Sequence, residues 1–250
     1  MREKPELKIF VFYLAFIVVA EAVTSFIDPS YGLFVHSVVL LSLLALSAFW
    51  HGANPTSNLF LGLSLAPLIR IISLSLPLAY FPRYAWYLVA SVPVLAATAT
   101  VIRVQGLSLR DVGVTLNKPF AQVGIPLAGV PFGFVEYHIL KPEPLALGLS
   151  PLGFALLALA FIFSTGFVEE LIFRGVLQKN AIEAFGKGPG IMGVTAVFTA
   201  LHIGWLSLLD LLFVFTISLF FAFCVLKTGS IIGVSLCHGI ENVVLFLLMP

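Results

Sequence analysis

The sequence predicts an all-α integral membrane protein, a polytopic bundle of eight or nine transmembrane helices, some of them kinked. Hydrophobic residues make up 60% of the 250 residues and charged residues only 10%, whereas soluble domains contain about 25% charged residues. Apolar runs long enough to cross the hydrocarbon core recur along the chain. Because no block of mixed polarity could form a soluble domain, we expect a single membrane domain over residues 1–250.

The apolar runs give nine candidate spans. They are 8–27, 31–50, 57–80, 84–104, 119–138, 151–177, 189–205, 207–226 and 230–249. The runs 57–80 and 119–138 contain prolines, so we expect kinked or partly embedded helices there. The polar stretch 104–113 predicts a loop or a segment on the membrane surface, and residues 1–118 are grouped as the N-terminal helices. No small-residue cleavage pattern follows the first span, so we expect it to be retained.

Lysines and arginines predict the orientation, because cytoplasmic loops carry an excess of them. With nine spans and a cytoplasmic N-terminus, only Arg83 and Lys141 fall outside. The basic residues that fall inside are Arg2, Lys4, Lys8, Arg103, Arg110, Lys118, Lys179, Lys187 and Lys227. We therefore expect a cell-membrane protein, with the end of the 151–177 span near the cytoplasmic face.

Two function classes receive no support from the composition. The net charge of +1 is spread along the chain without a basic aromatic stripe, so we expect no nucleic-acid partner. Cys224 and Cys237 lie in apolar runs, where a buried hydrophobic role is more common than a disulfide or a metal ligand.

The strongest functional signal is the stretch from Val168 to Gly175, which contains Glu169, Glu170 and Arg174. A charge at the bilayer centre costs at least ~2.5 kcal/mol, so such groups indicate a functional site. Residues four apart share a helix face, so Glu170 can pair with Arg174, whereas adjacent residues diverge by about 100°. We therefore expect Glu170 to be anchored and Glu169 to be available for chemistry.

Two further polar clusters interrupt the last apolar runs: Phe198 with His202, and His238 with Asn242. A carboxylate and a histidine that face one cavity can activate a water molecule as general bases. An imidazole and a carboxamide can donate hydrogen bonds to the oxygen of a tetrahedral intermediate. Together these groups could hydrolyse a peptide bond.

A zinc site is the alternative use of the same side chains, with Glu170, His202 and His238 as ligands and Glu169 as the base. The sequence contains no HExxH motif, so this alternative has no spacing signature. The cofactor prediction is therefore none, with zinc kept as the minority alternative.

Other polar residues in the spans are expected to be structural. Glu241 lies about 60° from the face that His238 and Asn242 share, so we place it outside the reacting groups. We expect structural pairs or helix-end anchors at Glu21, Arg70, Glu136 and Asp210.

The predicted depths of Glu169 and His202 differ by roughly 10 Å, because the 151–177 span would end soon after Glu169 and the next would begin near Pro189. The depths agree if the second helix begins after Met192. We prefer this solution, because the glycines and proline of 186–190 could form a cytoplasmic loop.

The three motifs together resemble those of the CAAX protease and bacteriocin-processing family, the Abi or Rce1-like intramembrane glutamate proteases. They are Glu-Glu-x-x-x-Arg at Glu169, Glu170 and Arg174, Phe-x-x-x-His at Phe198 and His202, and His-x-x-x-Asn at His238 and Asn242. The resemblance covers about residues 150–248. It implies that Glu169 activates water with help from His202, and that His238 and Asn242 form the oxyanion site. It also implies a supporting role for Glu170, Arg174 and Phe198, and metal-independent chemistry.

We therefore expect an endopeptidase that cuts near the C-terminus of a lipidated (CAAX-type prenylated) or membrane-associated substrate, with the active site toward the cytoplasm. Its partners would be a peptide or lipidated protein and membrane lipids. One alternative is a non-enzymatic self-immunity or scaffold protein whose polar cluster only joins helices. Another is an ion-coupled transporter using Glu21, Arg70 and Asp210, although the chain shows no repeat symmetry.

Overall fold

The computed structural model describes residues 5–50, 54–77, 80–82, 85–145 and 148–249, and within them every regular element is a helix. Seven helical segments among these residues are long and apolar enough to cross a membrane: Glu6–Phe26, Pro29–Phe49, Pro55–Ser75, Trp86–Val104, Pro119–Leu140, Pro151–Phe185 and Leu208–Thr228. The predicted polytopic helical bundle is therefore confirmed. Two predicted spans, 189–205 and 230–249, correspond to shorter helices: Lys187–Ala200, and the apolar helix Ile232–Leu248.

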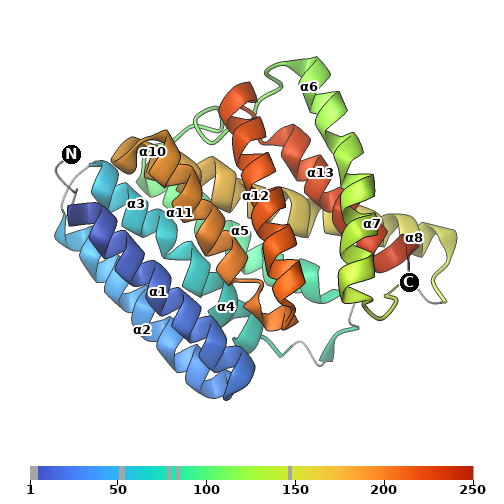
Figure 1. Ribbon diagram of the computed structural model, residues 1–250, viewed down its shortest axis with the longest axis horizontal. Helices are drawn as coiled ribbons and strands as arrows, with labels where there is room; N and C mark the ends of the chain where they lie inside the picture. Colours follow the sequence, from blue (N-terminus) through green and yellow to red (C-terminus); the bar gives the residue numbers. More distant parts are fainter. Residues whose placement is uncertain (1–4, 51–53, 78–79, 83–84, 146–147, 250) are drawn as a thin grey trace.

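The N-terminal helices form one side of the bundle (Figure 1). Helices α1 (Pro5–Phe26) and α2 (Pro29–Phe49) form an antiparallel hairpin, and the Asp28 side chain caps α2 by accepting a hydrogen bond from the Ser30 N–H at 2.7 Å. Helices α3 (Pro55–Leu63) and α4 (Leu65–Ser75) pack on α2, and α5 (Trp86–Val104) packs on α4.

The two kinked spans are bent at their prolines. Helix α3 ends at Leu63, four residues before Pro67, because a proline cannot donate to the carbonyl of residue i−4 and its ring clashes with that carbonyl. In the other span, α6 (Pro119–Gly124) and α7 (Gly129–Leu140) are joined by a 3₁₀ turn, η3 (Ile125–Ala128), that contains Pro126.

The polar stretch predicted as a loop forms a series of turns that are anchored in the bundle. Val112 is 1% exposed, and a Cβ atom on Gly175 would lie 2.8 Å from the Val112 carbonyl oxygen. The carbonyl of Gly113 accepts a hydrogen bond from the Ile231 N–H at 2.9 Å. The loop therefore packs directly against the helix that carries the acidic pair.

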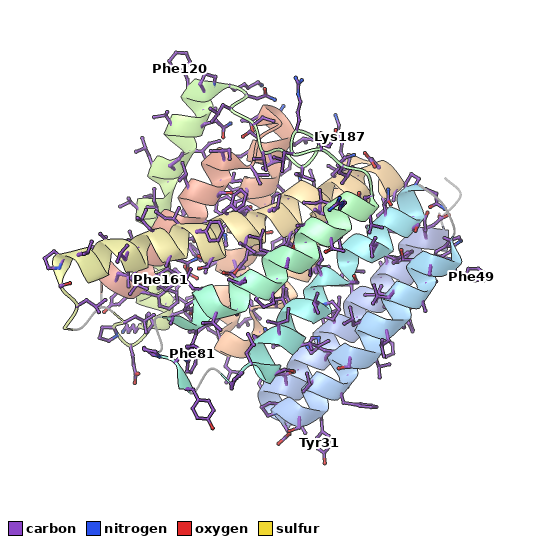
Figure 2. All side chains as sticks on the ribbon, turned by 180° about the vertical axis from the view of Figure 1, so that it is seen from behind. Tyr31, Phe49, Phe81, Phe120, Phe161 and Lys187 are labelled. Atoms are coloured by element: carbon purple, nitrogen blue, oxygen red, sulfur yellow. The ribbon has the colours of Figure 1, made fainter. Side chains whose placement is uncertain are left out.

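That helix is longer than predicted, running without a break from Pro151 to Phe185 over 35 residues (Figure 2). It comprises α8 (Pro151–Phe161), η4 (Ile162–Phe167), α9 (Val168–Glu170), η5 (Leu171–Leu177) and α10 (Gln178–Phe185). The segments η4 and η5 are π-helical, a conformation that is frequent at functional sites. The predicted end near residue 177 was wrong, because the helix ends only at Gly186, which adopts a left-handed φ of 89°.

Because the helix with the acidic pair is this long, the predicted difference in depth between Glu169 and His202 disappears. Helix α11 (Lys187–Ala200) begins directly after Gly186, so the prediction that it begins after Met192 was wrong. Glu169 lies about 25 Å along the helix axis before the turn at Gly186, and His202 lies about 24 Å after it, at 1.5 Å per residue. The two side chains therefore reach the same level from opposite directions along the chain.

Helix α13 (Ile232–Val243), which carries His238 and Asn242, lies between η4 and α7 and continues into the π-helical η7 (Val244–Leu248). Glycines allow the backbones to approach closely on both sides. A Cβ atom on Gly166 would lie 2.4 Å from the Ser235 carbonyl oxygen, and one on Gly133 would lie 2.4 Å from the Glu241 carbonyl oxygen. These contacts fix α13 against the acidic helix, and α12 (Leu208–Thr228) packs against α11 and η5.

Candidate active site

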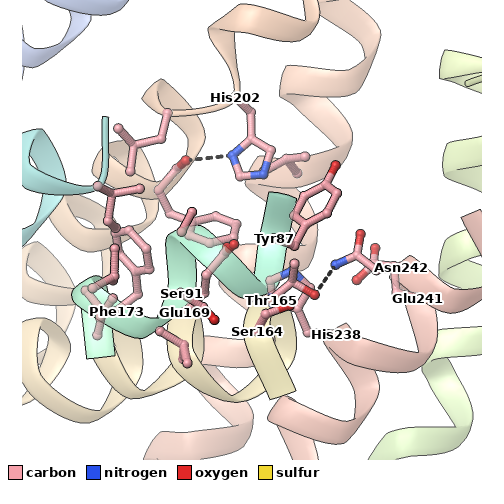
Figure 3. A pocket seen from close by; sticks show the side chains of 18 of the residues that line it. Tyr87, Ser91, Ser164, Thr165, Glu169, Phe173, His202, His238, Glu241 and Asn242 are labelled. Atoms are coloured by element: carbon pink, nitrogen blue, oxygen red, sulfur yellow. Dashed lines mark hydrogen bonds between the residues drawn. The ribbon is translucent and has the colours of Figure 1, made fainter. Parts of the chain in front are cut away.

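All four residues predicted to carry the chemistry line one cavity of about 290 Å³. Glu169 comes from α9, His202 from the turn after α11, and His238 and Asn242 from α13 (Figure 3). The supporting residues Glu170 and Arg174 are buried and lie outside the lining, whereas Phe198 forms part of the wall. Three motifs that are far apart in the sequence thus meet in one space.

The two adjacent glutamates occupy different environments. Glu170 is completely buried, whereas Glu169 is only partly buried and lines the cavity. Within the described ranges Glu169 makes no hydrogen bond or ion pair. Its carboxylate therefore keeps its acceptor positions for a molecule in the cavity.

Glu170 connects the acidic helix with α13. Its Oε1 accepts a hydrogen bond from Arg174 Nη1 at 2.9 Å and lies 3.0 Å from His238 Nδ1. Because an ionised carboxylate can only accept, His238 donates through Nδ1. The Nε2 atom of His238 then becomes a donor toward the cavity only when the ring is doubly protonated.

Arg174 is held from several sides. Its Nη2 donates to Ser218 Oγ on α12 at 2.9 Å, and its guanidinium carbon lies 4.4 Å from the centre of the Phe198 ring. A guanidinium over an aromatic face is attracted by the quadrupole of the ring. Phe198 also contacts the two histidines, with ring centres 4.8 Å from His202 and 6.0 Å from His238. Phe198 thus contacts the arginine and both imidazoles.

His202 has a different partner from His238. Its Nδ1 lies 2.9 Å from the Phe198 carbonyl oxygen, and a carbonyl can only accept, so Nδ1 carries the proton. In the neutral ring Nε2 is then an acceptor. His202 thus donates to a backbone carbonyl and has Nε2 free to accept a proton, whereas His238 donates to the Glu170 carboxylate.

Asn242 is oriented by a residue that the sequence analysis did not identify. Its Nδ2 donates to Thr165 Oγ1 at 3.0 Å, and the Thr165 hydroxyl donates to the Phe161 carbonyl at 2.7 Å. One N–H of the Asn242 amide is therefore used in the protein, and the second is left for a ligand. Thr165 lies four residues before Glu169, and this helical spacing was the signal available in the sequence.

A partly buried ion pair holds the His202 turn. Arg70 Nε donates to Glu21 Oε1 at 2.8 Å, and Arg70 Nη2 donates to the Leu201 carbonyl at 2.7 Å. Glu21 and Arg70, which were expected to be structural, thus pair with each other, and Arg70 also lines the cavity. Glu136 and Glu241, expected to lie outside the reacting groups, line the cavity as well.

The predicted zinc ligands do not converge. Among the residues with described positions, no three His, Cys, Asp or Glu side chains are grouped so that they could hold a metal ion. Glu170 directs Oε1 to Arg174 and His238, behind the cavity wall. Glu170 thus lies outside the cavity lining that contains His202.

Comparison with known proteins identifies the C-terminal part of the chain. Residues 151–244 match the model of the Type II CAAX prenyl endopeptidase Rce1-like family. No curated protein and no solved structure matches the chain. The matched segment contains all three motifs that line the cavity and supports a hydrolase of the intramembrane protease class. Residues 151–244, less than half of the 250-residue chain, are therefore similar to the Rce1-like family of Type II CAAX prenyl endopeptidases.

Proposed function

We propose that this protein is an intramembrane endopeptidase that hydrolyses a peptide bond near the C-terminus of a lipidated or membrane-associated substrate. One observation carries the proposal: an unpaired glutamate, two histidines and an asparagine from three separate motifs line one cavity. The family match supports the reaction class, and the apolar wall suits a substrate with a lipid or hydrophobic end.

Glu169 and His202 activate the attacking water in this proposal. A water molecule can donate one hydrogen to the Glu169 carboxylate and the other to His202 Nε2, so both O–H groups are polarised. As the water oxygen attacks the scissile carbonyl carbon, its proton moves to one of these bases. The base later delivers the proton to the leaving amine, and the C–N bond breaks.

His238 and Asn242 stabilise the tetrahedral intermediate. The free N–H of the Asn242 amide and the Nε2–H of doubly protonated His238 donate to the oxyanion. Glu170 and Arg174 act as positioning residues, because Glu170 fixes the His238 ring and Arg174 fixes Glu170. The proposed chemistry uses no metal ion.

The test is turnover of a lipidated fluorogenic peptide by the purified protein. Glu169→Ala and His202→Ala are each expected to lower kcat/KM by about 10²–10⁴-fold, the range for loss of a general base. Glu183→Ala removes an exposed glutamate 14 residues after Glu169 on the same long helix and serves as the matched control. Activity after exhaustive chelation, with metal analysis, is expected to be unchanged. Equal turnover in all variants would contradict the proposal and favour a scaffold role.

We further propose that the end of the bundle that carries the α10–α11 turn faces the cytoplasm of the cell membrane, with Glu169 about 25 Å along its helix from that turn. The loop before α6, the α10–α11 turn and the end of α12 lie at one end of the bundle (Figure 1), and Arg110, Lys118, Lys187 and Lys227 lie in or next to these segments. Cytoplasmic segments carry such an excess of basic residues.

Labelling with a membrane-impermeant maleimide tests this orientation. Lys187→Cys is expected to react only after the cells are permeabilised, whereas Lys141→Cys, which follows α7 at its other end, is expected to react in intact cells. The unsubstituted chain, with Cys224 and Cys237 only, gives the background. The reverse labelling pattern would invert the proposed orientation.

A further inference from the structure

Two carboxyl groups line the cavity without a part in the proposed hydrolysis: Glu136 on α7 and Glu241 on α13. Their exposed fractions are 8% and 5%. Neither forms a hydrogen bond or ion pair with any residue whose position the structure gives. Both groups are thus enclosed in a helix bundle, open to the cavity and unpaired.

The packing of α7 on α13 brings these two groups together. Gly133 lies against the backbone of Glu241, since a Cβ atom there would come within 2.4 Å of the Glu241 carbonyl oxygen. Glu136 follows Gly133 by three residues and shares its helix face. Its carboxyl is close enough to that of Glu241 for their charges to interact, and Asp210 adds a third buried acidic group nearby. No hydrogen bond joins the described acids, so they do not satisfy one another.

A buried carboxylate in a membrane protein is costly, and such a group is normally paired or functional. Among the described residues that line the cavity, only Arg70 is a lysine or an arginine. It is already held by Glu21 and the Leu201 carbonyl. Among the described residues no basic side chain pairs with Glu136 or Glu241, so both groups are accessible to a partner that enters the cavity.

We infer that Glu136 and Glu241 form a specificity subsite for a lysine or arginine side chain of the substrate peptide. The inference rests on the proposed function. An ammonium or guanidinium group supplies charge-assisted donors to the two carboxyl groups. Figure 3 shows Glu241 beside Asn242, on the opposite side of the pocket from Glu169 and Phe173. Because Asn242 holds the oxyanion, the basic residue lies within about two residues of the scissile bond, since one extended residue spans about 3.3–3.6 Å.

A peptide panel tests the subsite. The lipidated fluorogenic peptides differ only in having lysine, norleucine or glutamate at each position within two residues of the cleaved bond. At one position the wild-type protein is expected to show a kcat/KM at least tenfold higher for lysine than for norleucine, with glutamate the poorest. Glu136→Gln and Glu241→Gln are each expected to lower the lysine-to-norleucine ratio at least threefold, and the double variant to bring it near one. Glu183→Gln, on the protein surface, is expected to leave the ratio unchanged.

A wild-type protein with equal kcat/KM for lysine and norleucine at every position overturns the inference while leaving the hydrolase intact. A ratio that survives in the double variant also overturns it. Binding supplies a readout that does not depend on turnover or on folding of the Gln variants at positions 136 and 241. In the Glu169→Gln protein, the lysine peptide is expected to bind at least tenfold more tightly than the norleucine peptide, and equal affinities would overturn the inference. Failure of the wild-type protein to cleave any peptide counts against the proposed function instead.

Discussion

Glu169→Gln is expected to lower kcat/KM for a lipidated peptide by ~10³-fold without reducing the unfolding temperature, because the glutamine keeps the shape of the side chain but cannot take a proton. Glu169 makes no described hydrogen bond that the substitution could break. Glu170→Gln is expected to behave differently, lowering both the unfolding temperature and the turnover. Its Oε1 accepts from Arg174 and His238, and the neutral amide leaves the buried guanidinium without its counter-charge.

Thermal unfolding in detergent and steady-state kinetics on the same preparations separate the two roles. The pair forms its own control, because the substitutions are chemically identical and one residue apart. If Glu170→Gln proved stable and inactive while Glu169→Gln proved unstable and active, the roles assigned to the two glutamates would be reversed. If both retained full activity, neither residue would take part in catalysis.

The fold class was predictable from composition and apolar run length, because a chain with 10% charged residues must hide its backbone polar groups in helices within the bilayer. The kinks were predictable as well, since Pro67 and Pro126 remove backbone donors. The positions at which the helices end around Gly186 were harder to predict. Nothing in the apolar pattern distinguishes a helix that ends near residue 177 from one whose polar last turns continue to Phe185.

The candidate site was predictable where helical spacing links residues, as for Glu170 with Arg174. It was not predictable where contacts join distant helices. Three hydrogen bonds depend on how α12, α13 and α4 pack. They join Arg174 to Ser218, Asn242 to Thr165, and Arg70 to the Leu201 carbonyl. The π-helical segments on both sides of Glu169 also change the helical register, which simple counting at 100° per residue does not include.

Arg174→Leu is expected to destabilise the protein by ~3–5 kcal/mol, the usual cost of removing one partner of a buried ion pair. The Arg174 and Glu170 side chains are 1% and 0% exposed, so no water could solvate the Glu170 charge that remains. The measurement is the unfolding free energy in mild detergent. Lys179→Leu is the matched control, because Lys179 and Glu183 form an ion pair of the same i, i+4 spacing with both side chains partly exposed. The loss of the Lys179–Glu183 ion pair is expected to lower the unfolding free energy by less than ~1 kcal/mol.

The double variant Glu170→Gln/Arg174→Leu shows whether the pair acts only through stability. Removing both charges takes away the unpaired carboxylate, so the double variant is expected to regain most of the stability that Arg174→Leu loses. Turnover is expected to remain at least tenfold below that of the wild-type protein, because a neutral amide oxygen can still accept from His238 Nδ1 but offers no charge to support the doubly protonated ring. Recovery of stability together with full turnover would mean that the Glu170–Arg174 pair only holds helices together. Recovery of stability without recovery of turnover would mean that the Glu170–Arg174 pair also orients His238 for catalysis.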